Sequence, residues 1–139
     1  IAVGGPDPDV DVAVDRRQLV SALANLLDNA IKYSGTADTV EAAADVDGVS
    51  VRFMVRDHGI GIPATDQSRI FERFYRVDRA RRRDTGGTGL GLAIVRHVAL
   101  NHGGTVAVQS VEGQGATFML VIPRSLSTDD DRDVPGATP

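Results

Sequence analysis

The stretch DTVEAAADVDGVSVRFMVRDHGIGIP, residues 38–63, carries two strand-forming runs and ends in a bend that contains two glycines. The runs cover about residues 38–46 and 49–57, and Asp47-Gly48 between them is a typical two-residue hairpin turn. Along the second run, apolar residues alternate with serine and arginine, as in a strand with one buried face. The stretch therefore predicts an antiparallel hairpin that needs a covering layer.

A helix before the hairpin has the periodicity to supply that layer. Residues 16–34 follow Asp15, a typical N-cap residue. Leucine and alanine residues fall in one stripe of this helix, whereas Asn25, Asn29 and Lys32 fall on a different side. The helix therefore has one face for the core and one polar face.

The remaining segments complete the two layers. The further predicted elements are a strand at Ile1–Val3, a short helix at 65–76, a helix at 92–101 and a hairpin of 105–111 with 116–122. Residues 76–91 show charge and glycine but no apolar periodicity, and we expect a mobile loop there. The fold class predicted is α+β, a two-layer α/β sandwich. About three helices cover one face of a mixed, mostly antiparallel sheet of about five strands.

Composition limits the function classes. The 139 residues, 42% of them hydrophobic, suffice for one domain, expected over residues 1–123, with residues 124–139 as a disordered tail. The net charge of −4 argues against a general nucleic-acid binder, although residues 79–83 form a basic run. The chain has no cysteine for disulfides or thiolate metal sites, and no apolar run long enough to cross a membrane. We expect a soluble piece of a longer protein.

The stretch GGTGLGLAIV, residues 86–95, places its glycines directly before a predicted helix. The backbone N–H groups at a helix start attract anions, and glycine allows an anion to come close. The stretch is neither a Walker loop nor a dinucleotide-binding fingerprint. It predicts a polyphosphate site, and a flexible linker with a glycine-rich helix cap stays open as the alternative.

The polar face of the first helix suits a metal-bound phosphate. Asn25 and Asn29 lie four residues apart and Lys32 follows three residues later, so two amides and one ammonium group lie along one side. Amide oxygens suit a hard cation that is shared with phosphates. The alternative is that these are ordinary solvated positions.

The motif DHGIGIP, residues 57–63, suits adenine. Asp57 ends a strand, and its carboxylate can accept a hydrogen bond from the exocyclic amine while Gly59 and Gly61 let a flat ring approach. Guanine would present a carbonyl oxygen at the same point, so two acceptors would face each other. The alternative is a turn that Asp57 initiates.

Five motifs occur in the order NLLDNAIKY, DHGIGIP, IFERFYR, GGTGLGLAIV and EGQGATF. Together they closely resemble the ATP-binding catalytic domain of two-component sensor histidine kinases, over about residues 10–123. The resemblance implies membership of a superfamily shared with Hsp90 chaperones, type II topoisomerases and MutL. It also implies an α/β sandwich that holds ATP between a helix and a long flexible lid.

The resemblance implies roles for the matching residues. Asn29 would ligate Mg²⁺ with Asn25 in the same site, and the implied catalytic set is Asn25, Lys32 and Arg73, of which Lys32 and Arg73 would reach phosphate. Thr117 would support the adenine pocket through water, and Phe71 and Phe74 would anchor the lid, with core packing as an equal alternative. The residues implied to bind the nucleotide are Asn29, Lys32, Tyr33, Asp57, Gly59, Gly61, Ile62, Gly87, Gly89, Leu90, Gly91 and Thr117.

Asn25 stands where ATP-hydrolysing members of the superfamily place a glutamate that activates water. An amide cannot take a proton from water at neutral pH, so the resemblance implies transfer of the γ-phosphoryl group to a side-chain acceptor. None of His58, His97 and His102 stands in the H-E-x-x-T/S-P-like context of the family's acceptor histidine. We therefore expect the acceptor on a dimerisation domain outside this chain.

The implied ligands and partners are ATP, Mg²⁺, the histidine-bearing dimerisation domain of the same protein and a downstream response regulator. We expect no contact of this chain with nucleic acid or membrane. The chain should be a cytoplasmic monomer that belongs to a membrane-anchored sensor. Two alternatives stay open: an anti-sigma-type serine kinase built on the same domain, and a nucleotide sensor that transfers no phosphoryl group.

Overall fold

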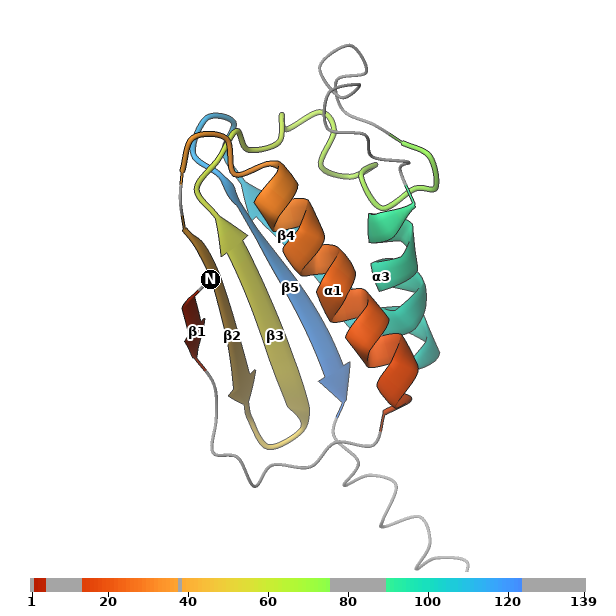
Figure 1. Ribbon diagram of the computed structural model, residues 1–139. Helices are drawn as coiled ribbons and strands as arrows, with labels where there is room; N and C mark the ends of the chain where they lie inside the picture. The colour runs from red at the N-terminus through yellow and green to blue at the C-terminus, as the bar shows by residue number, and fades with distance from the viewer. Residues whose placement is uncertain (1, 5–13, 38, 76–89, 124–139) are drawn as a thin grey trace, which may run out of the picture.

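A five-stranded sheet forms one layer of the protein. The computed structural model describes residues 2–4, 14–37, 39–75 and 90–123. The strands are β1 (Ala2–Gly4), β2 (Val40–Val46), β3 (Ser50–Asp57), β4 (Thr105–Ser110) and β5 (Ala116–Pro123). Their order in the sheet is β1-β2-β3-β5-β4, and only β1 pairs in parallel, with β2 (Figure 1). The predicted mixed, mostly antiparallel sheet is confirmed.

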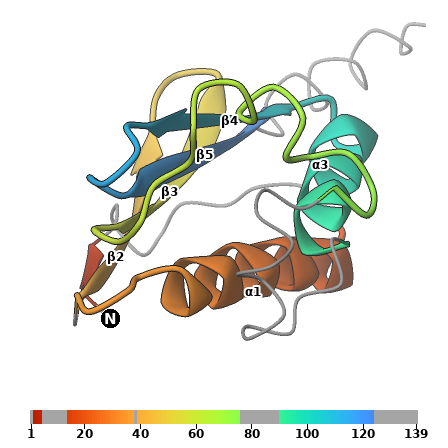
Figure 2. The same ribbon diagram turned by 90° about the horizontal axis from the view of Figure 1, so that it is seen from above.

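Two helices in the described residues form the second layer, α1 (Arg16–Lys32) and α3 (Gly91–Asn101). Figure 2 shows the sheet and α1 as separate layers, with α3 beside α1. The Asp15 carboxylate caps α1 by accepting a hydrogen bond from the Gln18 backbone N–H at 3.1 Å. The chain leaves α3 through Gly103 at a φ of 72°, a left-handed conformation that glycine adopts without strain. The helices predicted at 16–34 and 92–101 are confirmed.

The core lies between the layers because side chains alternate along the strands. On β5, Ala116, Phe118, Leu120 and Ile122 are buried, and the residues between them lie on the uncovered face. The buried helix residues that pack with these strands are Ala22, Leu26 and Ala30 of α1 and Val95, Val98 and Ala99 of α3. Burial of each large apolar side chain contributes about 1.5–3 kcal/mol.

The helices run in opposite directions, and one imidazole joins two of their ends. Nε2 of His102, which follows α3, accepts the backbone N–H of Asp15 at 2.9 Å. Nδ1 therefore carries the ring proton and donates to the Val98 carbonyl at 2.8 Å. The start of α1 is thus tied to the end of α3, which leaves the end of α1 and the start of α3 together at the opposite end of the sandwich (Figure 1).

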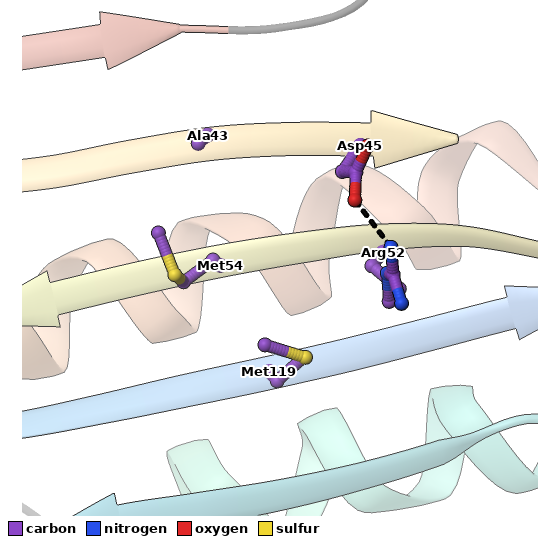
Figure 3. A pocket seen from close by; sticks show the side chains of 5 residues that line it. All are labelled: Ala43, Asp45, Arg52, Met54 and Met119. Atoms are coloured by element: carbon purple, nitrogen blue, oxygen red, sulfur yellow. Dashed lines mark hydrogen bonds and ion pairs between the residues drawn. The ribbon is translucent and has the colours of Figure 1, made fainter. Parts of the chain in front are cut away.

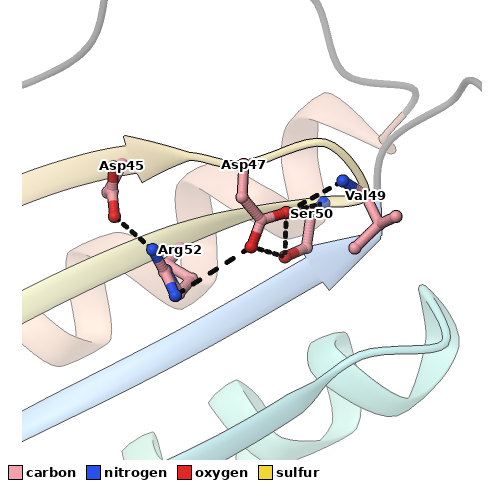
Figure 4. A network of polar contacts seen from close by, with 5 residues as sticks. All are labelled: Asp45, Asp47, Val49, Ser50 and Arg52. Atoms are coloured by element: carbon pink, nitrogen blue, oxygen red, sulfur yellow. Dashed lines mark hydrogen bonds and ion pairs between the residues drawn. The ribbon is translucent and has the colours of Figure 1, made fainter.

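The β2–β3 hairpin is confirmed, but its turn lies one residue later than predicted. The Asp47 N–H donates to the Ser50 carbonyl at 3.0 Å, so these two residues close the hairpin around Gly48 and Val49. Asp47 Oδ1 accepts the N–H groups of Val49 and Ser50, each at 2.8 Å, and Arg52 pairs with Asp45 and Asp47 beside them (Figure 4). The N–H group of Val49, followed by that of Ser50, lowers the pKa of Asp47.

The predicted helix at 65–76 is wrong for its described part. Hydrogen bonds to the third residue back, such as Arg69 N–H to the Asp66 carbonyl at 2.9 Å, form successive turns without an α-helix. Tertiary contacts override helical propensity here. The Phe71 ring lies edge-on against Phe118 with centroids 6.1 Å apart, and Phe74 has a φ of 67° that no α-helix contains. The tail at 124–139, the basic run at 79–83 and most of the predicted lid lie outside the described residues.

Candidate functional site

Four segments meet at one end of the sandwich. They are the last turns of α1, the loop 58–62 after β3, the β4–β5 turn at 111–115 and the start of α3 (Figure 1). β3 runs toward this end, and the antiparallel helices bring the end of α1 and the start of α3 to it. Four of the five resembling motifs contribute to this end, which makes it the candidate site.

Asp57 is a buried carboxylate at this end. Its relative exposure is 3%, and no other charged or polar residue among those described is buried. Oδ1 accepts the Gly59 backbone N–H at 2.9 Å, and the Ala116 N–H donates to the same carboxylate. Burial raises the pKa of Asp57, and the two N–H groups oppose that rise. A carboxylate accepts about four hydrogen bonds, so Asp57 keeps capacity for a further donor.

Glycines bring three backbone segments against one another around Asp57. A Cβ on Gly59 would lie 1.9 Å from the Tyr33 carbonyl oxygen at the end of α1. The next residue, Ile60, donates its N–H to that same oxygen at 3.2 Å. A Cβ on Gly115 would lie 2.1 Å from the Asp57 carbonyl oxygen. Only glycine permits approaches this close, so these two positions define the wall of the site by main chain alone.

The loop 58–62 is further held against the β4–β5 turn. Gly61 has a φ of 70°, and a Cβ there would lie 2.4 Å from the Val111 carbonyl oxygen. The Gly113 N–H donates to the Ile60 carbonyl at 2.7 Å. Gly59 and Gly61, which the sequence analysis assigned to the adenine pocket, therefore lie with Ile62, assigned to the nucleotide, in one loop directly after Asp57, and Tyr33 lies against this loop.

The polar face of α1 points toward the start of α3. The Asn25 amide donates to the Ser21 carbonyl at 2.9 Å, and its Oδ1 would lie 2.9 Å from a Cβ on Gly91. Asn29 is half-buried one turn later, and its side chain makes no hydrogen bond within the described residues. Glycine at 91 therefore lets α3 begin directly beside the Asn25 amide.

Lys32 has a partner that the sequence analysis missed. Its Nζ lies 3.3 Å from Asp28 Oδ2, four residues earlier on α1, with both side chains exposed. The spacing of four residues was the available signal. An exposed pair of this kind contributes about 0.2–1 kcal/mol, so an incoming phosphate can take over the ammonium group at small cost.

The start of α3 suits an anion. Leu90 is its N-cap, and the apolar Leu90 side chain makes no capping hydrogen bond. The first N–H groups of a helix have no intrahelical acceptor and form an anion site together with the helix dipole. Gly91 is the first helical residue, whereas Gly87 and Gly89 lie outside the described residues.

Thr117 is not brought to the site, which corrects its assignment to the adenine pocket. Thr117 lies between buried Ala116 and buried Phe118, so its side chain is on the uncovered face of the sheet. Ala116 is the residue opposite Asp57 in the β3–β5 ladder. Side chains alternate along a strand, so the neighbour of Phe118, an obvious core residue, must face away from the core. This pattern in the sequence could have indicated Ala116 in place of Thr117.

Arg73 and Phe74 lie outside the group of contacts around Asp57. Arg73 is exposed in the turns after Ile62, with its guanidinium 5.3 Å from the centre of the Phe74 ring. Phe74 is 61% exposed, while Phe71 packs on Phe118, so core packing describes Phe71 alone. Within the described residues, no contact joins Arg73 to the polar face of α1.

At this end of the sandwich, a hard cation would be held by side-chain amides of the protein together with phosphates of the ligand. Within the described ranges, no cluster of three or more His, Asp or Glu side chains is arranged to hold a metal ion. The oxygen donors that α1 offers at this end are Asn29, whose amide has no hydrogen-bond partner in the described part of the chain, and Asn25, whose oxygen is turned to α3. Amide oxygens alone hold Mg²⁺ weakly, which fits a metal that arrives with a phosphate.

A hollow on the opposite face of the sheet is a separate feature. It has a volume of about 210 Å³ and is lined by Ala43, Asp45, Arg52, Met54 and Met119 (Figure 3). Nucleotide-sized pockets have volumes of about 300–1,000 Å³. None of the residues assigned to the nucleotide lines this hollow, so the buried carboxylate, and not the hollow, locates the site.

Comparison with known proteins identifies the family of the chain. Residues 14–126 match the model of the family described as histidine kinase-, DNA gyrase B-, and HSP90-like ATPase. The chain belongs to this ATPase family. The match includes α1, both hairpins and α3, and therefore every described segment of the site.

Curated relatives within this family are sensor kinases. The sensor-like histidine kinase SenX3 of Mycobacterium tuberculosis is 51% identical over 120 residues, which are 85% of this chain and 29% of SenX3. The sensor histidine kinase WalK of Bacillus subtilis is 42% identical over 130 residues, which are 92% of this chain and 21% of WalK. The chain thus spans less than a third of the length of these relatives.

Solved structures of family members share the fold. The mycobacterial sensor histidine kinase MprB superposes with a TM-score of 0.75 at 32% identity, over 88% of this chain and 80% of that structure. Full-length ShkA in complex with AMPPNP superposes with a TM-score of 0.74 at 37% identity, over 88% of this chain and 25% of that structure. In the described part of this family member, no helix has the length and apolarity to span a membrane.

Proposed function

We propose that this domain binds Mg·ATP and donates the γ-phosphoryl group to a histidine on a dimerisation domain of the same protein. The observation that carries the proposal is the buried Asp57 carboxylate, which has acceptor capacity left and lies behind a loop that approaches through glycine backbone. The structure of full-length ShkA, which shares this fold, is a complex with AMPPNP, an ATP analogue.

Asp57 would select the base. Its carboxylate accepts a hydrogen bond from the exocyclic amine of adenine, while Gly59, Gly61 and Ile62 border the ring together with Tyr33. Guanine is disfavoured because its carbonyl oxygen would oppose a buried carboxylate that already lies in a low-dielectric setting. Ala116, which donates its N–H to Asp57, holds the carboxylate in place.

The polar face of α1 and the start of α3 would hold the triphosphate. Asn29 would hold Mg²⁺, with Asn25 in the same site, and the metal would supply charge neutralisation at the phosphates. Lys32 exchanges Asp28 for a phosphate oxygen. The backbone N–H groups after Leu90 would face the phosphates, and the resemblance assigns Gly87 and Gly89, which lie outside the described residues, to the triphosphate as well. Arg73 is the least supported member, because its contact in the structure is with Phe74.

Asn25 favours a side-chain acceptor over water. The amide has no basic group at neutral pH, and its Nδ2 already donates to the Ser21 carbonyl. Phosphoryl transfer to an oriented imidazole needs positioning and charge neutralisation more than a strong base. The acceptor is proposed outside this chain. The three histidines here have other partners, since His58 pairs with Glu41, His97 contacts Asn101 and His102 joins the helix ends.

The relatives are named as sensor kinases, so we propose a response regulator as the downstream partner and the cytoplasm as the compartment. The test has two stages. Calorimetry with a non-hydrolysable ATP analogue, with and without Mg²⁺, measures binding by the chain itself. The chain is then joined to the dimerisation domain of the parent protein and incubated with γ-labelled ATP.

Label that is stable to base and labile to acid, as phosphohistidine is, supports the proposed transfer. Acid-stable label would indicate a serine acceptor and overturn the histidine kinase assignment. Binding without any label would leave a nucleotide sensor and overturn the proposed transfer.

A further inference from the structure

The Ser110 hydroxyl bridges two walls of the site. Ser110 is the last residue of β4, and its Oγ accepts the Ile62 backbone N–H at 2.9 Å across 48 residues of sequence. The same hydroxyl donates to the Gly115 carbonyl at 2.7 Å. Gly115 in turn lies against the Asp57 backbone. One side chain therefore links the end of the glycine loop to the turn that backs the buried carboxylate.

Gln67 reinforces this link from a third segment. Its Nε2 donates to the Ile62 carbonyl and to the Ser110 carbonyl, each at 2.9 Å. Both hydrogens of the amide are thereby used. Ile62 is held through its N–H by Ser110 and through its carbonyl by Gln67, so both backbone groups of this loop residue are committed.

These bonds are directional and half-buried, so they fix the loop in a way that apolar contacts do not. Loss of the Ser110 hydroxyl would leave the Ile62 N–H and the Gly115 carbonyl without their partner. The loop 58–62 would then retain the Gly113–Ile60 and Ile60–Tyr33 bonds at one end, whereas at the other end Ile62 would keep the bond from Gln67 to its carbonyl but lose the bond of its N–H.

We propose that Ser110 and Gln67 are positioning residues that clamp the loop 58–62 and thereby set the preference of the site for adenine over guanine. This inference rests on the proposed function of Asp57. The clamp acts by holding the loop at one distance from the Asp57 carboxylate, so that a base with the wrong edge cannot be accommodated by a small shift of the loop. Neither residue is assigned a contact with ATP.

The test compares Ser110→Ala and Gln67→Ala with a matched control, Ser50→Ala. Ser50 is the first residue of β3, at the opposite end of that strand from Asp57, and among the described residues its hydroxyl bonds to the nearby Asp47 carboxylate alone. Affinities for the non-hydrolysable analogues of ATP and GTP are measured by calorimetry on the 139-residue chain. Hydrogen exchange of the Ile62 amide, followed by NMR, reports the clamp without any nucleotide.

Ser110→Ala is expected to lower the ratio of ATP to GTP affinity by about 5-fold or more, the effect of leaving one buried polar group unpaired. Exchange of the Ile62 amide should accelerate at least about 10-fold, because that N–H loses its acceptor. Ser110→Thr keeps the hydroxyl and should keep most of the selectivity. Ser50→Ala should change neither quantity, and Gln67→Ala should lower the ratio without removing the Ser110 side chain.

A selective wild-type chain whose Ser110→Ala and Gln67→Ala variants keep full selectivity would overturn this inference alone. Equal losses in Ser50→Ala would also overturn it, since they would indicate a general loss of stability. A wild-type chain without preference for ATP over GTP would overturn the proposed role of Asp57 and this inference together. Where Ser110→Ala unfolds, Gln67→Ala and Ser110→Thr decide the matter in the same assays.

Discussion

Replacement of Asp57 by asparagine changes the recognised edge of the base with little change in shape. Asp57 is 3% exposed, and its Oδ1 accepts the Gly59 N–H at 2.9 Å. Asparagine keeps one oxygen for that bond and replaces the other by an NH₂ donor. A donor at this point opposes the exocyclic amine of adenine and matches the carbonyl oxygen of guanine. Asp57→Asn should therefore weaken ATP and favour GTP.

The size of the effect follows from the burial of this group. A buried hydrogen-bonding group left without its partner costs about 1–3 kcal/mol, which corresponds to about 5- to 150-fold in Kd for ATP. The gain of a bond to guanine adds to the change in selectivity, by about 0.5–1.5 kcal/mol for a typical net hydrogen bond. The ratio of ATP to GTP affinity should thus fall by about 10-fold at least.

The assay is calorimetric titration with the non-hydrolysable analogues of ATP and GTP, together with thermal unfolding to establish that the variant folds. Asp45→Asn is the matched control, because Asp45 carries an exposed carboxylate on β2 and pairs with Arg52 on the uncovered face of the sheet. The control should bind both analogues as the wild type does. A folded Asp57→Asn variant with unchanged selectivity would refute the assignment of Asp57 to adenine.

Three further predictions concern the metal, the backbone wall and pH. Asn29→Ala should weaken binding of the ATP analogue far more in Mg²⁺ than in EDTA, and equal losses in both titrations would remove Asn29 as a metal ligand. Gly59→Ala should destabilise the fold by about 1–3 kcal/mol or more in denaturant unfolding, because its Cβ would lie 1.9 Å from the Tyr33 carbonyl oxygen. The control Gly48→Ala, with nothing within 4 Å of its Cβ, should change stability by less than about 0.5 kcal/mol, and similar losses in both would contradict the close approach. Burial raises the pKa of Asp57, so binding titrations at successively lower pH should show the affinity for ATP falling as this carboxylate takes up a proton. The Asp57→Asn variant should lack this part of the pH dependence. The raised pKa means that Asp57 takes up its proton at a higher pH in the folded state than in the unfolded chain. The contribution of Asp57 to the free energy of unfolding should therefore rise as pH falls, and a contribution that fell instead would contradict the direction of the pKa shift.

The sequence was a good guide where neighbouring residues decide the structure. The cap at Asp15, the periodicity of α1 and α3 and the alternation of the two hairpins are all confirmed. These features depend on spacings of two to four residues, so a local pattern contains the information. The prediction of a helix at 65–76 was wrong because the core contacts of Phe71 and the left-handed backbone of Phe74 decide the path of this segment. Helical propensity is too weak to override these contacts.

The site shows the same division. Local sequence patterns are enough to identify the residue types available: a carboxylate followed by glycines after a strand, amides and a lysine on one helix face, and a glycine-rich helix start. The folded arrangement of the chain was needed to learn that Asn25 lies against Gly91, that Ala116 and not Thr117 lies beside Asp57, and that Ser110 holds Ile62. Those contacts join residues far apart in the chain, and their existence depends on strand register and on how two helices pack, which no short stretch of sequence encodes.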